Sequence, residues 1–342
     1  MEHKEYIAIS KDVAEKLSNH FEKFCKKNPA FSLISKEYTQ KRIHLNGIQF
    51  YAGFKAANSK EDFAKFFNIP IAIECIMLAA YKTNRILDHK QEVWSSEQKI
   101  KETVLGEKIY LSLIFALLED SKENLGEKYP VVQDLIIDLI SKIYQGFWYE
   151  QNDLNVNFSP QKEILKNWSS KYKKRNILFN GVYDYSSLIG FYIGSGDNSV
   201  FKKFENYFKN KDKMSHSAQV VNDVSDYSSV YDENVKSYQD AFSDIRNGII
   251  TQPTFELIKD KVILDALKNP QLTKDVSWRK KVINILIKKN VVAKIKKETE
   301  KSYAQNINFW KKIMKVDSEL LFNTYSILSR NKYYHEFLNY KK

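Results

Sequence analysis

Apolar residues recur at spacings of three and four along most of the chain, which is the period of an amphipathic α-helix. The first such pattern spans residues 11–27. Patterns that are apolar on most sides predict buried central helices over residues 72–88, 101–119, 131–149 and 174–192, and a basic helical pattern runs from about 291 to 338. No alternation of period two is long enough to predict a sheet. Because 342 residues contain only 10 Gly and 6 Pro, we predict a mainly helical, all-α protein, folded either as one large domain or as two smaller ones.

Two of the helical stretches, residues 72–88 and 218–254, carry oxygen-bearing side chains that share a helix face. These side chains are Asn84 and Asp88 in the first stretch and Asn222, Asp223 and Asp226 in the second. Residues four apart, such as Asn84 and Asp88, lie one above the other on a helix. Carboxylate and amide oxygens are ligands that Mg²⁺ accepts together with a bound phosphate. We therefore interpret both stretches as candidate metal-binding faces.

Glycines inside the helical patterns mark places where helices are expected to approach one another closely. Gly106 opens the apolar half of the pattern over residues 101–119. Gly181 and Gly190 lie within the pattern over residues 174–192. Since glycine has no Cβ, another backbone can come near it, and we expect helix contacts at all three positions.

The chain is basic, with 54 Lys and Arg against 42 Asp and Glu, a formal net charge of +12. The lysines are spread along the whole sequence, which is typical of solvated helix faces and argues against a nucleic-acid-binding protein. Denser basic patches occur at residues 171–175, 279–281 and 294–297. Such patches suit an anionic ligand, and a diphosphate fits that description as well as a phosphate backbone does.

The two cysteines and the apolar runs indicate the cellular compartment in which we expect the protein. Cys25 and Cys75 are far apart and show neither a disulfide framework nor a zinc spacing, so we expect reduced thiols in a cytoplasmic protein. We expect no secretory signal. The longest apolar runs, near residues 69–81 and 109–118, are too short to span a bilayer, so we predict no transmembrane segment.

Short motifs follow one another along the chain in a characteristic order. They are Gln40, Lys41, Arg42 and His44; Glu74 and Met77 with Asn84, Arg85 and Asp88; Gly106 and Glu107; Lys174 and Arg175; Gln219 with Asn222, Asp223 and Asp226; and Asp244, Gly248, Ile249, Thr251, Gln252 and Pro253. In this order and spacing the chain resembles the trans-polyprenyl diphosphate synthases, a branch of the class I isoprenoid synthases. The resemblance covers most of the chain, and the last two groups match best.

This resemblance implies an all-α helical bundle that forms a single domain over residues 1–342. The bundle surrounds a central active-site cavity, in which two acidic helix ends face each other. It implies a site for an allylic prenyl diphosphate, with three Mg²⁺ ions bound to the diphosphate. The implied metal ligands are Asn84, Asp88, Asn222, Asp223 and Asp226, of which Asp88, Asp223 and Asp226 are the candidate catalytic carboxylates. The implied substrate-binding residues are Lys41, Arg42, Arg85, Lys174 and Gln219, with Ala79 and Ala80 setting the depth of the prenyl channel. A homodimer, or a heterodimer with a homologous synthase, is also implied.

The sequence departs from the family pattern at several of these positions. The first acidic motif keeps only its last carboxylate, Asp88, and the second has Asn222 in place of one carboxylate. Met77 replaces a His that the resemblance would place at the isopentenyl site, and Ile249 replaces a diphosphate-binding Lys. These departures weaken the case for chain elongation.

Three functional hypotheses follow from this comparison. The favoured one is a terpene synthase that ionises one allylic diphosphate, cyclises it and releases diphosphate. The second is a chain-elongating prenyltransferase that adds isopentenyl diphosphate, which Lys41 and Arg42 support. The third is a weakly active or inactive partner subunit. Because Ala79 and Ala80 are small, the substrate is expected to have about twenty carbons or more.

Overall fold

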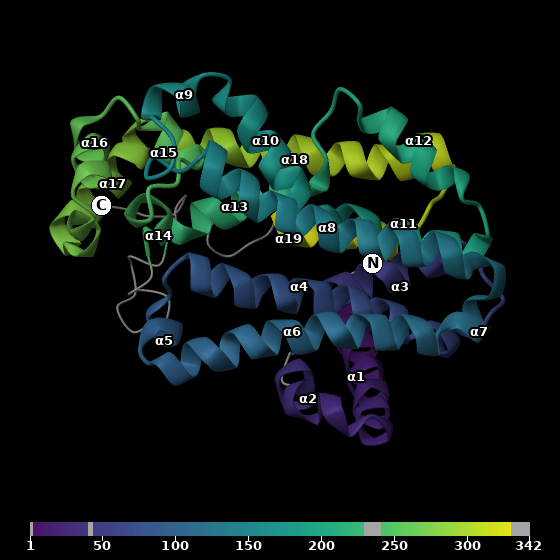
Figure 1. The fold of residues 1–342 in the computed structure, drawn as a ribbon. Helices are drawn as coiled ribbons and strands as arrows, with labels where there is room; N and C mark the ends of the chain where they lie inside the picture. Colours follow the sequence, from purple (N-terminus) through teal and green to yellow (C-terminus); the bar gives the residue numbers. More distant parts are fainter. Residues whose placement is uncertain (1–2, 40–43, 229–240, 330–342) are drawn as a thin grey trace.

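The computed structural model describes residues 3–39, 44–228 and 241–329. Lys41 and Arg42, two of the predicted substrate-binding residues, lie outside these ranges. The described residues form helices joined by turns, with no strand among them, and an isolated antiparallel bridge pairs Asn155 with Ile249. The predicted all-α fold is confirmed (Figure 1).

The helices have the following bounds in chain order. The α-helices are α1 (His3–Lys27), α2 (Ser32–Thr39), α3 (Leu45–Ala56), α4 (Asn68–Leu87), α5 (Gln91–Trp94), α6 (Glu97–Asp120), α7 (Lys122–Leu125), α8 (Tyr129–Asp153), α9 (Gln161–Leu165), α10 (Trp168–Phe179), α11 (Gly181–Ser195), α12 (Ser199–Phe208), α13 (Met214–Ser228), α14 (Ser243–Arg246), α15 (Gln252–Glu256), α16 (Lys261–Lys268), α17 (Val276–Lys288), α18 (Val291–Asn308) and α19 (Glu319–Ser329). Short 3₁₀ segments are η1 (Pro29–Phe31), η2 (Phe63–Phe66), η3 (Gly126–Lys128) and η5 (Pro270–Lys274), and η6 (Phe309–Met314) is a π-helix.

Helix α4 occupies the centre of the bundle, with α6 and α8 packed along it (Figure 1). Its first three turns are apolar on nearly every side, and Ile69, Ile71, Ile73 and Cys75 are all fully buried. A helix that is hydrophobic all round is stable only when other helices surround it. The polar residues at its other end are therefore carried on a rigid, buried element.

The extended helical stretch Phe63–Leu87 is long and apolar enough to cross a membrane by length and composition. It exceeds the apolar run in the sequence because η2 leads directly into α4. However, 72% of its apolar window is buried inside the protein. It therefore has the character of a core helix.

Helices α3 and α11 cross so closely that the contact requires glycine. A Cβ added to Gly190 would lie 2.1 Å from the carbonyl oxygen of Phe50, and one added to Gly53 would lie 2.0 Å from that of Ser187. The close contact predicted at Gly190 is thus confirmed, as is that at Gly181, where a Cβ would lie 3.2 Å from Leu139 Cδ2. The prediction at Gly106 is wrong, because a Cβ there would meet only the flexible Lys82 side chain at 3.5 Å.

The pattern over residues 174–192, predicted as one helix, is divided between α10 and α11. The break falls at Asn180, whose backbone leaves helical geometry with φ −112° and ψ 21°. Its side-chain amide donates to Gln219 Oε1 at 2.7 Å, which ties the junction to α13. Asparagine favours such side-chain bonds over a continuous helix. The pattern from 291 to 338 is likewise interrupted, since the chain turns at Lys315 with a φ of 57°.

Two hydrophobic cores fill the molecule. The larger core joins residues of α1, α3, α4, α6, α8, α11 and α12. The second lies where α13 meets α10 and the shorter helices α14 to α17, and includes Trp168, Tyr227 and Ile249. The cavity described next is lined by helices that belong to both regions.

Candidate functional site

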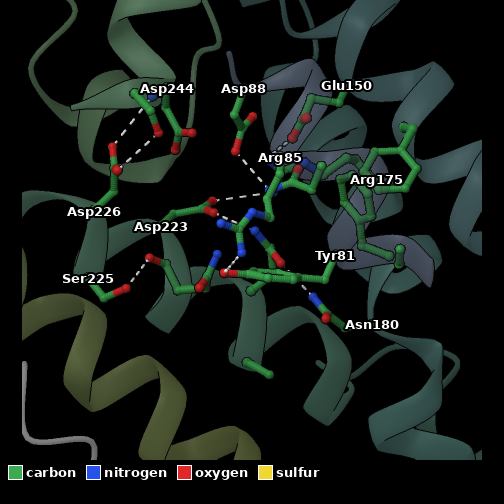
Figure 2. Close-up of a pocket in the computed structure, with 18 of the residues that line it drawn as sticks. Tyr81, Arg85, Asp88, Glu150, Arg175, Asn180, Asp223, Ser225, Asp226 and Asp244 are labelled. Carbon is green, nitrogen blue, oxygen red and sulfur yellow. Dashed lines mark hydrogen bonds and ion pairs between the residues drawn. The ribbon is translucent and has the colours of Figure 1, made fainter. Parts of the chain in front are cut away.

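A cavity of about 700 Å³ opens between the C-terminal parts of α4 and α8, helices α10 and α13, and the start of α14. This volume lies within the range of small-molecule sites. One part of its wall is charged and the other apolar. Figure 2 shows the carboxylates of Asp88, Glu150, Asp223, Asp226 and Asp244 grouped at the charged part.

The end of α4 contributes Asn84, Arg85 and Asp88, followed by Lys90. Asn84 donates to Asp88 Oδ2 at 2.8 Å, so the predicted pair shares one face and is already bonded to itself. Arg85 folds back along its own helix, where it donates to Tyr81 Oη at 3.1 Å and lies over the Tyr81 ring. Lys90 Nζ is 3.6 Å from Asp88 Oδ2. The charged part of the cavity therefore contains cationic side chains beside its carboxylates.

The junction of α13 and α14 contributes Asp226 and Asp244. Ser243 Oγ donates to Asp226 Oδ1 at 3.1 Å, and Lys90 Nζ donates to Ser243 Oγ at 2.9 Å. Lys90 thereby links the end of α4 to the opposite wall. The Asp226 and Asp244 side chains are only half-buried and line the cavity.

Asp223 is held by three side chains that leave neither of its carboxylate oxygens without a donor. Tyr172 Oη donates to Oδ2 at 2.5 Å, and Gln219 Nε2 donates to Oδ1 at 2.6 Å. The guanidinium of Arg175 also donates to Oδ2, at 3.4 Å. The Asp223 side chain is 2% exposed, so these bonds replace water around it.

Arg175 is the buried cation of the site, with a side chain only 2% exposed. One amino group of its guanidinium donates to Glu150, and the other donates to Asn176 Oδ1 at 2.8 Å and to Asp223. Burial opposes the charge of Arg175, but Glu150 and Asp223 raise its pKa well above the ordinary value. Arg175 is therefore a permanently charged part of the wall.

The preceding residue, Lys174, does not line the cavity. It is exposed and packs over the ring of Tyr149 while donating to the Tyr149 hydroxyl. The inward face of α10 carries Tyr172, Arg175 and Phe179, at helical spacings of three and four. Lys174 falls about 100° away from Arg175 on the same helix, so the two cannot both face the ligand.

The remaining carboxylates of the site carry raised pKa values, chiefly because they are buried. Burial raises the pKa of Glu150 to about 7, although Arg175 opposes the shift. Burial likewise raises the pKa of Asp88 and of Asp226, while Lys90 lowers both. Asp244 has a pKa well above its ordinary value, because of burial and then because of the charges of Asp226 and Asp223. Each of these carboxylates is therefore easier to protonate than an exposed carboxylate.

The donor set fits a divalent cation on one side of the cavity and not on the other. Among the described residues, no group of three or more His, Cys, Asp or Glu side chains lies close enough together to hold an ion. Asp226 and Asp244 are the carboxylates left on the other side, and an ion between them would take its remaining oxygens from a bound ligand, which is how hard cations bind phosphates. Asp223 and Glu150 do not fit, because Arg175 already occupies the space between them.

The apolar part of the cavity is lined by Met77, Ala80, Phe147, Phe179 and Tyr183. These side chains come from α4, α8, α10 and α11, so the apolar wall is built from the central helices. Ala80 faces the cavity. Ala79 does not, since it is 1% exposed and packed in the core. Of the two predicted channel residues, the structure therefore places only Ala80 on the wall.

Most of the sequence-predicted site residues come together in this one cavity. The structure brings together Ala80, Asn84, Arg85, Asp88, Gln219, Asn222, Asp223 and Asp226. It places Lys174 and Ala79 elsewhere, and their predicted roles are left as predictions without support from position.

Several cavity residues were not assigned a role from the sequence. They are Lys90, Glu150, Arg175 and Ser243. Tyr172, which does not line the cavity, was also not assigned a role and acts through Asp223. Glu150 had a signal, because it is a charged residue at the end of the apolar pattern over residues 131–149. The sequence analysis gave Arg175 only together with Lys174, as a basic pair. Nothing in the sequence indicated which of the two side chains points into the cavity.

The fold is similar to solved structures over nearly its whole length. Geranylgeranyl pyrophosphate synthetase from Pyrococcus horikoshii Ot3 matches with a TM-score of 0.70 and 14% identity, covering 100% of both chains. A decaprenyl diphosphate synthase from Rhodobacter capsulatus matches with a TM-score of 0.67 and 12% identity, also covering 100% of both. Geranylgeranyl pyrophosphate synthase from Corynebacterium glutamicum, complexed with isoprenyl diphosphate and magnesium, matches with a TM-score of 0.64 and 14% identity, covering 96% of this chain and 99% of that one.

No protein-family model and no curated protein matches the sequence itself. At 12 to 14% identity, the structural similarities establish the fold. The chain has the class I isoprenoid synthase fold in the form seen in trans-polyprenyl diphosphate synthases, and the predicted fold is confirmed in this respect.

Proposed function

We propose that the protein binds an allylic prenyl diphosphate in this cavity and extends it with isopentenyl diphosphate, as a prenyltransferase. The observation that carries the proposal is the division of one cavity into a charged part and an apolar part. A prenyl diphosphate has the same division, with an anionic head and a long apolar tail. The solved structures with this fold are prenyl diphosphate synthases by their names, which favours elongation over cyclisation.

In the proposed binding mode, the diphosphate lies at the charged part, where Arg85 and Lys90 face the cavity. Each donates hydrogen bonds that strengthen as negative charge develops on the leaving group. A divalent cation such as Mg²⁺, held by Asp226 and Asp244 together with oxygens of the diphosphate, would neutralise further charge on the departing diphosphate. The allylic cation left behind lies among Phe147, Phe179 and Tyr183, whose rings stabilise positive charge and exclude water.

Cyclisation of a single substrate is the second candidate, because two positions depart from an elongating site. Met77, and not a histidine, lines the cavity on α4. Ile249 is 1% exposed and packs in the second core, so it presents no charge to the diphosphate. A site without a second diphosphate would tolerate both changes.

The size of the cavity supports a substrate of about twenty carbons or more. Its volume of about 700 Å³ and the small Ala80 side chain leave room for a long tail. We further propose that residues 1–342 form one domain, that two copies associate through α6 and α8, and that the protein is cytoplasmic. Cys25 and Cys75 are buried and form no disulfide, as expected in a reducing compartment.

The test is incubation of the purified chain with Mg²⁺ and geranyl, farnesyl or geranylgeranyl diphosphate, with and without isopentenyl diphosphate. Longer diphosphates that form only with isopentenyl diphosphate would support elongation. Hydrocarbons or alcohols formed without it would support cyclisation instead. An absence of product under all conditions would contradict both and favour a non-catalytic partner subunit.

A variant pair assigns any activity to the cavity. Asp226→Ala should lower product formation at least about a hundredfold, because it removes a carboxylate that is proposed to hold the divalent cation at the diphosphate. Asp134→Ala removes an exposed carboxylate on α8 and should leave activity unchanged. Equal activity in the two variants would place the reaction elsewhere.

A further inference from the structure

Arg175 has a role that diphosphate binding alone does not explain. Its guanidinium bonds to Glu150 and Asp223, and both carboxylate side chains are at most 5% exposed. Arginine usually reaches a ligand with free N–H groups. Here both amino groups already have protein partners, and the Nε atom is buried. Arg175 is therefore a fixed element of the site.

The carboxylates of the cavity fall into two groups according to their countercharge. Glu150 and Asp223 are neutralised by the arginine between them. Asp226 accepts hydrogen bonds from Ser243 Oγ and from the backbone N–H of Asp244, and Asp88 contacts Asn84 and Lys90. Without Arg175, Glu150 and Asp223 would be two buried carboxylates with no countercharge. They would then need protons or another cation to remain buried.

Both carboxylate oxygens of Asp223, where a metal ion would otherwise bind, already accept hydrogen bonds from protein side chains. Its Oδ2 atom receives hydrogen bonds from Tyr172 and Arg175, and its Oδ1 atom receives one from Gln219. Three donors around one carboxylate leave little room for a metal ion at the same oxygens. Gln219 is in turn held by Asn180, so this arrangement extends to the α10–α11 junction.

We propose that the guanidinium of Arg175 takes the place of a divalent cation between Glu150 and Asp223. Arg175 then supplies a permanent positive charge at this position, in addition to the charges of Arg85 and Lys90, and divalent ions are confined to the side of Asp226 and Asp244. The part of this inference that concerns a bound diphosphate head group rests on the proposed function. The occupation of the position between Glu150 and Asp223 is a property of the protein alone.

The inference predicts that removing Arg175 creates a metal site. Arg175→Thr leaves Glu150 and Asp223 as neighbouring buried carboxylates, whose oxygens are ligands for Mn²⁺ and Mg²⁺. Mn²⁺ binding to the full chain at pH 8, without diphosphate, is measured by isothermal titration and electron paramagnetic resonance. We expect Arg175→Thr to bind one more Mn²⁺ per chain than the unchanged protein, or to bind it at least about tenfold more tightly.

Three further variants separate this effect from a general loss of charge. Arg175→Lys keeps the positive charge and should gain no ion. Arg175→Thr combined with Glu150→Gln removes one of the two carboxylates and should lose the gain. Lys171→Thr removes a charge from the same helix outside the cavity, where Lys171 donates to the Glu163 carbonyl, and should match the unchanged protein.

Circular dichroism and urea unfolding establish that each variant is folded before titration. If Arg175→Thr unfolds in metal-free buffer and regains a cooperative transition in Mn²⁺, the proposal is supported. A variant that folds but binds no additional Mn²⁺ overturns it. If Arg175→Thr stays unfolded in Mn²⁺, Arg175→Gln is titrated in its place, and the same criterion applies.

Inorganic diphosphate distinguishes this inference from the proposed function. The unchanged protein should bind diphosphate in EDTA more tightly than Arg175→Thr by at least about tenfold, because it keeps its built-in cation. Failure of every variant to bind diphosphate, with or without Mn²⁺, would overturn the proposed function. The Mn²⁺ titration without diphosphate would still decide whether Arg175 occupies an ion position.

Discussion

Asp223 and Asp226 lie three residues apart on α13, yet their surroundings differ. Asp223 is fully buried and bonded to Tyr172, Gln219 and Arg175, whereas Asp226 is half-buried and contacts Ser243. The sequence predicted from helical spacing that both lie on one oxygen-bearing helix face, and the family resemblance implied that this face borders a cavity. It could not predict their partners, because these come from α10 and α14 and depend on how those helices pack.

Ala80 and Ala79 provide a residue-scale prediction about substrate length. Ala80→Phe should shift product or substrate preference toward shorter chains, because its ring would fill the apolar part of the cavity. Ala79→Phe should leave the length preference nearly unchanged and destabilise the protein by about 1 to 3 kcal/mol, because position 79 is packed in the core. Product chromatography and urea unfolding measure the two effects. A length shift in Ala79→Phe and none in Ala80→Phe would contradict this assignment.

Asp184 provides a prediction about pH. It is 2% exposed on α11, its Oδ1 accepts the Ser215 N–H at 3.1 Å, and its Oδ2 has no hydrogen-bond partner. Burial raises its pKa to about 6. Between about pH 4 and pH 6 the folded state therefore holds a proton that the unfolded state has released, so this group makes the protein less stable as pH rises through that window.

Asp184→Asn should remove this pH dependence. The difference in unfolding free energy between pH 4.5 and pH 8 should change by about 2 to 3 kcal/mol relative to the unchanged protein, in favour of pH 8. Urea unfolding at the two pH values measures it. Asp134→Asn, an exposed carboxylate on α8, is the control and should show no such change. A pH dependence identical in all three proteins would show that Asp184 is not protonated in the folded state at low pH.

At the scale of helices, the hydrophobic pattern predicted which segments are helical better than it predicted where they end. The pattern over residues 131–149 became α8, which continues to Asp153 and so includes Glu150. The break between α10 and α11 was missed because the apolar period continues through Asn180. What ends α10 is a side-chain bond from Asn180 to Gln219, a residue on a different helix, and no local pattern reports it.

The crossing of α3 and α11 gives a prediction at this scale. Gly190→Ala should destabilise the protein by about 3 kcal/mol, because the new methyl would lie 2.1 Å from the Phe50 carbonyl oxygen and the helices must separate. Gly106→Ala should be neutral or stabilising by up to about 1 kcal/mol, because it meets only the Lys82 stem and alanine is the better helix former. Urea unfolding compares them, and equal effects would refute the close crossing.

At the scale of the whole molecule, the order of the motifs predicted both the fold and the meeting of two polar helix ends. The fold and the meeting of the two helix ends both depend on the order of the motifs along the chain, and that order can be read from the sequence. Arg175 and Glu150 were not predicted as partners because they are 25 residues apart and meet only through the packing of α8 against α10. The single-domain organisation stays a prediction.

The association of two copies is a prediction about the surface of α6 and α8. Leu105 and Phe115 of α6 are 61% and 50% exposed, and Trp148 of α8 is 69% exposed. Tyr144 Oη donates to Glu107 Oε1 at 2.6 Å, which joins the two helices, and Trp148 lies one turn beyond Tyr144. Exposed apolar side chains at neighbouring positions of two helices are typical of a contact surface.

Leu105→Glu combined with Trp148→Glu should convert a dimer into a monomer with little change in helix content. Sedimentation velocity at micromolar concentration and circular dichroism measure this. Phe158→Glu changes an equally exposed aromatic residue in the loop after α8 and should leave the dimer intact. A monomeric unchanged protein would contradict the proposed association.

The charged part of the cavity draws on the ends of α4 and α8, on α10, on α13 and on the start of α14. During synthesis, Asp88 leaves the ribosome long before Asp244 does. Until α14 has emerged and docked, the acidic residues of α4 and α13 have no Ser243 or Asp244 opposite them. A growing chain therefore lacks the complete charged part of the cavity, so the proposed binding of a diphosphate requires that most of the protein has been made.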